Sequence, residues 1–140
     1  MERDQLERIF ERRRLALEAR DVTTLMKDYA EDCIVESPVA GVHTGKKTIE
    51  ETMRAVFSSL DAHIRQQSVL IDGDRAAVAT VMEGKDVGEF LGLPPTGKSF
   101  RVPLVFLYEL RDGKITHERR IYDFTGLLLQ IGLLKAKPAI

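Results

Sequence analysis

The stretch GEFLGLPPTGK (88–98) and the sequence that leads on to RIYDFTGLLLQIG (120–132) decide the fold. Between them, two strand-like runs flank Asp-Gly at 112–113. Asp-Gly between alternating apolar runs is a strong signal for a two-residue hairpin turn. The sequence therefore predicts two long antiparallel strands, at 99–110 and 114–123, with a glycine- and proline-rich loop ahead of the first.

The rest of the chain predicts helices first and strands afterwards. Apolar residues repeat at helical spacing in the first part, and alternating runs follow. The other expected elements are helices at 2–19, 23–30, 46–60 and 127–134 and strands at 33–37, 63–72 and 75–85. This order predicts an α+β fold, in which three N-terminal helices pack on one face of a curved antiparallel sheet. The length of 140 residues predicts a single domain, 1–140.

Composition excludes several functional classes. Charged residues make up 31% of the chain, and the net charge of −1 argues against a nucleic-acid partner. The run Arg12-Arg13-Arg14 alternates with glutamates and predicts a solvated helix face. One cysteine and three scattered histidines favour neither a disulfide nor a metal site, so we expect no metal. The charged N-terminus and the lack of an apolar run of about 18 residues predict a cytoplasmic protein without a membrane partner.

A register argument singles out Asp123. If Asp112 and Gly113 are the two loop residues, Val102 faces Asp123 and Leu104 faces Ile121. Side chains alternate along a strand, so Asp123 and Ile121 would point toward the helices, with Arg119 two pairs away on the same face. An acid in an apolar pocket suits proton transfer at carbon, because burial disfavours the charged carboxylate.

Alternatives remain for this residue and for others. Asp123 precedes an apolar segment and is equally typical of a helix N-cap. A one-residue slip of the register would turn it to the other face. Glu83 fits a second buried acid or a solvated strand end, and His43 fits a loop site or a solvent-facing residue. Asp86, in the loop, is expected to be exposed.

The segments GEFLGLPPTGK, DGKI and RIYDFTGLLLQIG, together with HTGKKTIEE at 43–51, resemble the SnoaL-like polyketide cyclases. These belong to the nuclear transport factor 2-like (cystatin-like) superfamily, which includes ketosteroid isomerase. The resemblance covers nearly the whole chain. It implies a cone-shaped fold around a deep apolar pocket, with an Asp at the position of Asp123 as general acid/base in an intramolecular aldol ring closure. It also implies that this reaction needs no metal and no cofactor. Asp86 departs from the family, which usually has histidine there.

We therefore expect an enzyme that performs acid–base chemistry, such as ring closure, isomerisation or hydration, on a small apolar carbonyl or polyketide-like molecule. Asp123 is the expected catalyst. The expected substrate-binding residues are Tyr29, His43, Met53, Phe57, Glu83, Phe90, Leu104, Phe106, Arg119 and Ile121. The resemblance also implies a homodimer. A binding protein that kept only the pocket and a protein-interaction module are the alternatives, since one fold hosts many functions. The 86–98 loop and the segment 127–134 are expected to close the pocket mouth.

Overall fold

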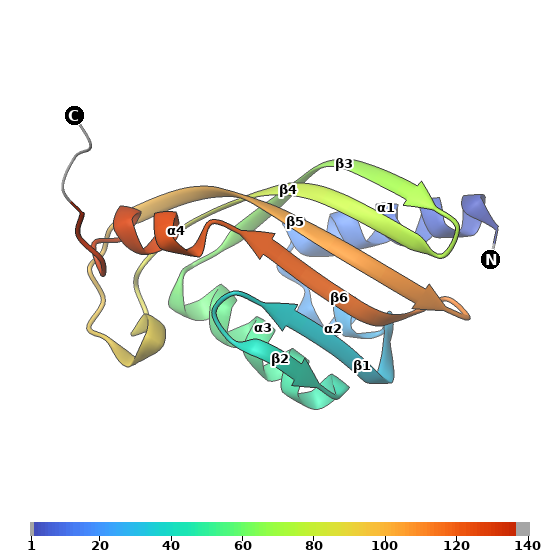
Figure 1. Cartoon of the computed structure of the whole chain (residues 1–140), viewed down its shortest axis with the longest axis horizontal. Coiled ribbons are helices and arrows are strands. Elements are labelled where there is room, and N and C mark those ends of the chain that lie inside the picture. Colours follow the sequence, from blue (N-terminus) through green and yellow to red (C-terminus); the bar gives the residue numbers. More distant parts are fainter. Residues whose placement is uncertain (1, 137–140) are drawn as a thin grey trace.

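A computed structural model describes residues 2–136 and confirms the α+β class. Six strands form one curved sheet in the order β2-β1-β6-β5-β4-β3, with the first three helices behind it (Figure 1). The helices are α1 (Arg3–Glu18), α2 (Val22–Met26), α3 (Lys46–Ser59) and α4 (Phe124–Gln130). The strands are β1 (Tyr29–Ser37), β2 (Gly41–Thr44), β3 (His63–Asp72), β4 (Arg75–Lys85), β5 (Ser99–Arg111) and β6 (Lys114–Tyr122).

The first part of the chain differs from the prediction around α2. The predicted helix at 23–30 ends at Met26, and Tyr29 already begins β1. Asp21 caps α2 by accepting a hydrogen bond from the Thr24 backbone N–H. At the other end, the Asp28 carbonyl accepts from the Ile115 amide at 2.7 Å, which ties the start of β1 to β6. The tertiary pairing therefore overrides the local helical pattern, and Tyr29 becomes a strand residue.

The sheet is mixed rather than fully antiparallel. β3, β4, β5 and β6 form the predicted antiparallel meander, but β1 runs parallel to β6. β2, in a segment predicted as a loop, pairs antiparallel with β1. The sheet thus places β1, from the first half of the chain, beside β6, from the end, as Figure 1 shows.

The predicted hairpin turn is confirmed, but the predicted register is wrong. Asp112 and Gly113 both have positive φ, at 52° and 77°, as a type I′ turn requires. Leu110 pairs with Ile115, whereas the next residue back, Glu109, pairs with His117. Thr116 is therefore an extra residue in β6, a β-bulge, and its hydroxyl donates to the Glu109 carbonyl at 3.2 Å. Beyond the bulge every side chain of β6 faces the opposite way from the prediction.

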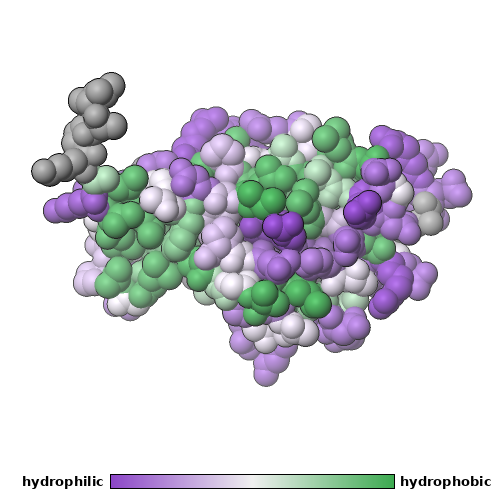
Figure 2. Space-filling model, viewed as in Figure 1, coloured by the Kyte–Doolittle hydropathy of each residue, from purple (hydrophilic) through white to green (hydrophobic). Residues whose placement is uncertain are grey.

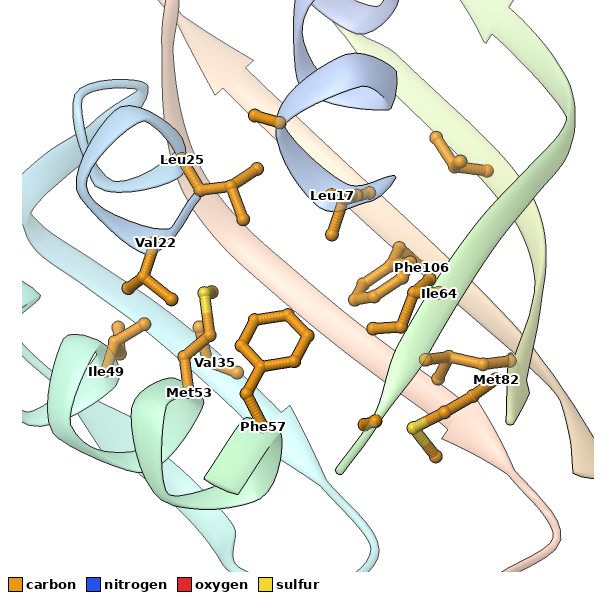
Figure 3. Packing of buried hydrophobic residues seen from close by; sticks show 14 of the residues in the cluster. Leu17, Val22, Leu25, Val35, Ile49, Met53, Phe57, Ile64, Met82 and Phe106 are labelled. Atoms are coloured by element: carbon orange, nitrogen blue, oxygen red, sulfur yellow. The ribbon is translucent and has the colours of Figure 1, made fainter. Parts of the chain in front are cut away.

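The core lies between the helices and the inner face of the sheet. Leu17 of α1 and Met53 and Phe57 of α3 point toward Ile64 and Phe106 of the sheet (Figure 3). The space that these side chains leave incompletely filled is the candidate site described below. No helix within residues 2–136 has the length and apolar character needed to cross a lipid bilayer.

Candidate functional site

An inner pocket of about 60 Å³ lies between α1, α3 and the sheet. Most of its wall is apolar, and part of that wall is visible in Figure 3. The lining residues are Arg13, Leu17, Tyr29, Ser37, Val39, Met53, Val56, Phe57, Ile64, Met82, Leu104, Phe106, Arg120 and Tyr122. An apolar wall with a few convergent polar groups is the usual composition of a small-molecule site.

The bulge at Thr116 brings charged residues of β6 to this inner side. Leu104 pairs with Tyr122 and Phe106 pairs with Arg120, so Glu118, Arg120 and Tyr122 face inward. Glu118 is fully buried, and the Arg120 side chain is 14% exposed. Burial of a carboxylate is unfavourable unless it is paired and hydrogen-bonded, so its partners decide whether this arrangement is stable.

Glu118 has two such partners, one on each carboxylate oxygen. The Tyr29 hydroxyl donates a short hydrogen bond to Oε1. The Arg120 Nε donates to Oε2 at 2.6 Å. Tyr29 and Arg120 also line the inner pocket, whereas Glu118 lies behind them. The result is a buried chain, Tyr29–Glu118–Arg120, that connects an enclosed carboxylate to the pocket through two donors.

Arg13 of α1 extends this chain. Its Nη2 donates to the Tyr29 hydroxyl at 3.2 Å and to the Tyr108 hydroxyl at 3.4 Å. Its Nη1 donates to Asp28 Oδ2 at 3.1 Å and to the Leu25 carbonyl. Arg13 is 2% exposed, and its Nε has no hydrogen-bond partner among the described residues. A cation predicted to be solvated is thus part of the pocket wall.

Burial and charge set the protonation states of these groups. Burial, reinforced by the Glu118 charge, raises the pKa of Tyr29 well above its usual value. Burial likewise raises the pKa of Tyr108 to about 12. Burial lowers the pKa of Arg120, but Glu118 and the nearby tyrosines outweigh it, so the pKa of Arg120 is raised overall. Near neutral pH the two tyrosines are therefore neutral donors and the arginine is a cation.

Comparisons with known proteins agree with this geometry. Residues 8–131 match the SnoaL-like polyketide cyclases. The chain belongs to this family. A nogalonic acid methyl ester cyclase from Streptomyces nogalater is 34% identical over 94 residues, which cover 66% of this chain and 70% of that protein. An aklanonic acid methyl ester cyclase from Streptomyces galilaeus is 32% identical over 80 residues, which cover 57% of this chain and 55% of that one.

A solved structure supports the fold. A Catenulispora acidiphila protein described as having a ketosteroid isomerase-like fold superposes with a TM-score of 0.75 at 21% identity. The match covers 93% of this chain and 97% of that chain. At this level of identity the likeness shows the fold, which is the one that the SnoaL-like family resemblance predicts.

Within this SnoaL-like fold, the predicted position of Asp123 in the core is wrong. Asp123 lies beyond the end of β6, is exposed, and caps α4 by accepting from the Gly126 amide at 2.8 Å. The cause is the bulge at Thr116, which the register argument did not include. The helix-cap alternative is therefore confirmed as its structural role, while its catalytic role stays a prediction.

The other predicted site residues divide into two groups. Five line the inner pocket as expected, namely Tyr29, Met53, Phe57, Leu104 and Phe106. Five do not line it, namely His43, Glu83, Phe90, Arg119 and Ile121. Arg119 and Ile121 point to the outer face because of the bulge, and Glu83 forms exposed ion pairs with Arg65 and Arg101. His43 lies on the edge strand β2, and the Phe90 ring packs against Phe124 instead.

The expectation that Asp86 is exposed is wrong as well. Asp86 is 1% exposed, and its Oδ2 accepts from the Thr96 amide at 3.0 Å. The Thr96 hydroxyl donates to the Ile131 carbonyl at 2.6 Å, so the loop is joined to the end of α4. None of the inner-pocket lining comes from either segment, and the lid role remains a prediction.

Sequence reasoning missed Arg13, Tyr108, Glu118 and Arg120. A signal for Arg13 was present, because Leu6, Phe10, Arg13 and Leu17 occupy one helical stripe. For Glu118 and Arg120 the sequence carries no comparable signal, since the bulge decides their direction.

Proposed function

We propose that this protein is a polyketide cyclase that closes a ring by acid–base chemistry carried by its own side chains, on an apolar carbonyl substrate held in the inner pocket. The observation that carries the proposal is the buried chain Tyr29–Glu118–Arg120, whose two ends, Tyr29 and Arg120, line that pocket. The family and the two Streptomyces cyclases support the reaction class. Ionisable groups with shifted pKa values converge on the apolar inner pocket, which supports this pocket as the place of the reaction.

In the first step, Glu118 accepts a proton through Tyr29. The Tyr29 oxygen takes a proton from an activated carbon of the substrate while its own proton moves to Glu118. The high pKa of Tyr29 suits this relay, because the hydroxyl passes a proton on without staying ionised. The product is a substrate enolate, and Arg120 stabilises its oxygen by charge-assisted hydrogen bonding.

In the second step, the enolate carbon attacks a second carbonyl of the same molecule. A carbon–carbon bond forms and the carbonyl becomes an alkoxide. Tyr29 protonates that alkoxide and recovers a proton from Glu118, which returns to its carboxylate form. No atom is lost, so the product is an isomer of the substrate. The apolar residues around Phe57 and Phe106 hold the two reacting ends close together, which supplies much of the acceleration in an intramolecular reaction.

Incubation with an aromatic polyketide methyl ester tests this proposal. The relatives are named for nogalonic and aklanonic acid methyl esters, so these two compounds are the first substrates to use. We expect conversion to a product of unchanged mass with a new chromatographic retention. Binding without conversion would favour the alternative of a binding protein that kept only the pocket.

Asp123→Asn separates the two candidate carboxylates. Asp123 as general acid/base, as the family resemblance implies, predicts a loss of turnover of roughly 10²–10⁴-fold. The Glu118 relay instead predicts turnover within a few-fold of the parent, because Asn keeps the side-chain oxygen that accepts from Gly126. Initial rates with the methyl ester decide between them. Asp123→Ala is the control for the cap, and it should lower the free energy of unfolding by about 1 kcal/mol.

We also propose a homodimer formed through the outer face of the sheet. This face carries less charge than the predicted register implied, because Glu118 and Arg120 point inward. Leu70, which is 71% exposed, adds to it, and Figure 2 shows apolar residues gathered over β4 and β5 beside polar ones. A sedimentation mass near twice 15.8 kDa at micromolar concentration is expected. A mass near 15.8 kDa would contradict the proposal.

A further inference from the structure

We propose that the substrate carries an acidic oxygen, ionised at neutral pH, that Arg120 binds where the inner pocket meets a groove on the protein surface. The inference rests on the proposed function and adds a substrate class to it, apolar molecules that bear an ionised hydroxyl group in addition to the reacting carbonyls. The groove, called the outer groove below, has a volume of about 330 Å³ and lies beside β1 and β6. Ser37, Arg120 and Tyr122 line both spaces and form their common wall.

The guanidinium of Arg120 has donors to spare at this wall. Its Nε is engaged by Glu118, and within residues 2–136 neither Nη atom has a hydrogen-bond partner. An arginine keeps its charge at every physiological pH, and its planar fork matches two oxygens of an anion. Because the side chain is 14% exposed, a ligand can reach the free donors without leaving them in bulk water. Charge-assisted hydrogen bonds are strongest under such conditions.

The charges around the groove permit an anion there. Arg119 also lines the groove and adds a second cation. One carboxylate, Glu36, lines it too, but His117 Nε2 lies 2.6 Å from Glu36 Oε2 and Arg119 Nε lies 3.7 Å from the same atom. The negative charge of Glu36 is thus offset by its own partners, while Arg120 has only Glu118 as an ion-pair partner among the described residues.

A second unpartnered donor lies deeper in the pocket. Arg13 is 2% exposed and lines the inner pocket, and its Nε has no hydrogen-bond partner among the described residues. The Arg13 guanidinium also lies over the Tyr29 and Tyr108 rings, 5.2 Å and 5.4 Å from their centroids, so a second positive charge is held on the inner side of the pocket. Arg13 and Arg120 can each bind one oxygen of the same ligand. The apolar wall around Met53 and Phe57 suits the hydrocarbon part of the ligand between those two oxygens.

The inner pocket alone is smaller than the range of about 300–1,000 Å³ that is typical of ligand sites. At about 60 Å³ it holds only part of a polycyclic molecule, so the rest must lie in the outer groove. This places the common wall, and therefore Arg120, against the middle of the ligand rather than at its end. A cation at that position favours ligands that carry a negative charge there and so contributes to specificity.

Two probes of nearly equal shape test the inference. 2-Hydroxy-1,4-naphthoquinone is an acid that is ionised at neutral pH, and 2-methoxy-1,4-naphthoquinone is its neutral counterpart. We expect the wild-type protein to bind the ionised probe more tightly, by roughly 10- to 100-fold, as measured by calorimetric titration. Arg120→Gln should abolish that preference while it leaves the affinity for the neutral probe nearly unchanged. Lowering the pH toward the range where the hydroxyl probe is protonated should reduce the preference of the wild type.

Two further variants keep the test decisive. Arg101→Gln removes an exposed arginine of β5 that lines neither space, and it should retain the preference. Glu118→Gln/Arg120→Gln removes both buried charges together, so it serves if the single variant fails to fold, and it should also lack the preference. Equal binding of both probes by the wild type, or a preference that survives in the Arg120 variants, would overturn the inference.

The outcome is independent of the proposed reaction. If the protein converts a methyl ester but does not prefer the ionised probe, the proposed substrate class is wrong and the proposed cyclase function stands. If the protein prefers the ionised probe but converts no methyl ester, anion binding at Arg120 is supported and the proposed cyclase function is contradicted.

Discussion

Glu118→Gln is expected to reduce turnover by roughly 10²–10⁴-fold, the range typical for loss of a positioned acid or base. Gln keeps the shape of Glu, and its carbonyl oxygen can still accept from Tyr29 or Arg120. It cannot accept a proton, so the relay through Tyr29 stops. Because the interaction is made in the transition state, kcat should fall with little change in KM. Initial rates with a methyl ester substrate give both constants.

The control for this variant is Glu83→Gln. Glu83 is a partly exposed glutamate on the outer face of β4, where it pairs with Arg65 and Arg101. Its replacement by Gln should leave turnover unchanged. Affinity of Glu118→Gln for the neutral naphthoquinone, measured alongside, shows whether the pocket is still formed. If Glu118→Gln still binds the probe and its turnover stays within a few-fold of the parent, Glu118 is not the proton acceptor.

The sequence predicts the fold because its strongest local signals are also the ones that the tertiary structure keeps. The turn at 112–113 forms where the Asp-Gly signal places it, and long alternating runs become β3, β4 and β5. Pairings between distant segments were not predictable in this way. The parallel contact of β1 with β6 joins residues about 80 positions apart, and no local pattern encodes such a partner.

The site was predicted less well, because one residue reverses a whole strand. Leu104 and Phe106 on β5 were placed correctly, because the bulge in β6 does not change which way they face. Tyr29 lines the pocket as expected, although it does so from β1 and not from the predicted helix. On β6 the bulge at Thr116 places Arg120 and Tyr122 on the inner side, where the sequence predicted Arg119 and Asp123. A bulge in a strand carries no fixed sequence signature, and a one-residue slip moves every later side chain to the other face.

Arg13 illustrates a different failure. The charge run 12–14 predicts solvent, whereas the apolar stripe of α1 predicts burial at the same position. The structure follows the stripe, because Asp28 and two tyrosine hydroxyls supply the partners that make a buried guanidinium tolerable. A buried cation with partners on three elements connects the helical layer to the sheet, so its removal should affect the whole domain.

Arg13→Met is accordingly expected to lower the free energy of unfolding by about 3–5 kcal/mol, the usual effect of removing one partner from a buried ion pair. Methionine fills much of the volume but donates to neither Tyr29 nor Tyr108 and leaves the Leu25 carbonyl without its side-chain donor. Asp28, at 4% exposure, keeps Arg12 as a partner, which places the expected loss at the lower end of that range. Urea unfolding with matched slopes measures the difference.

Arg12→Met is the matched control, because the two neighbouring arginines share one acceptor. Arg12 Nη2 donates to Asp28 Oδ1 at 2.7 Å, a shorter contact than the 3.1 Å from Arg13 Nη1 to Oδ2. The Arg12 side chain is nevertheless 47% exposed, against 2% for Arg13. Water replaces an exposed partner readily, so Arg12→Met should lower stability by about 1 kcal/mol or less. If the two variants lose equal stability, distance rather than burial governs the pair, and Arg13 is not the residue that joins α1 to the sheet.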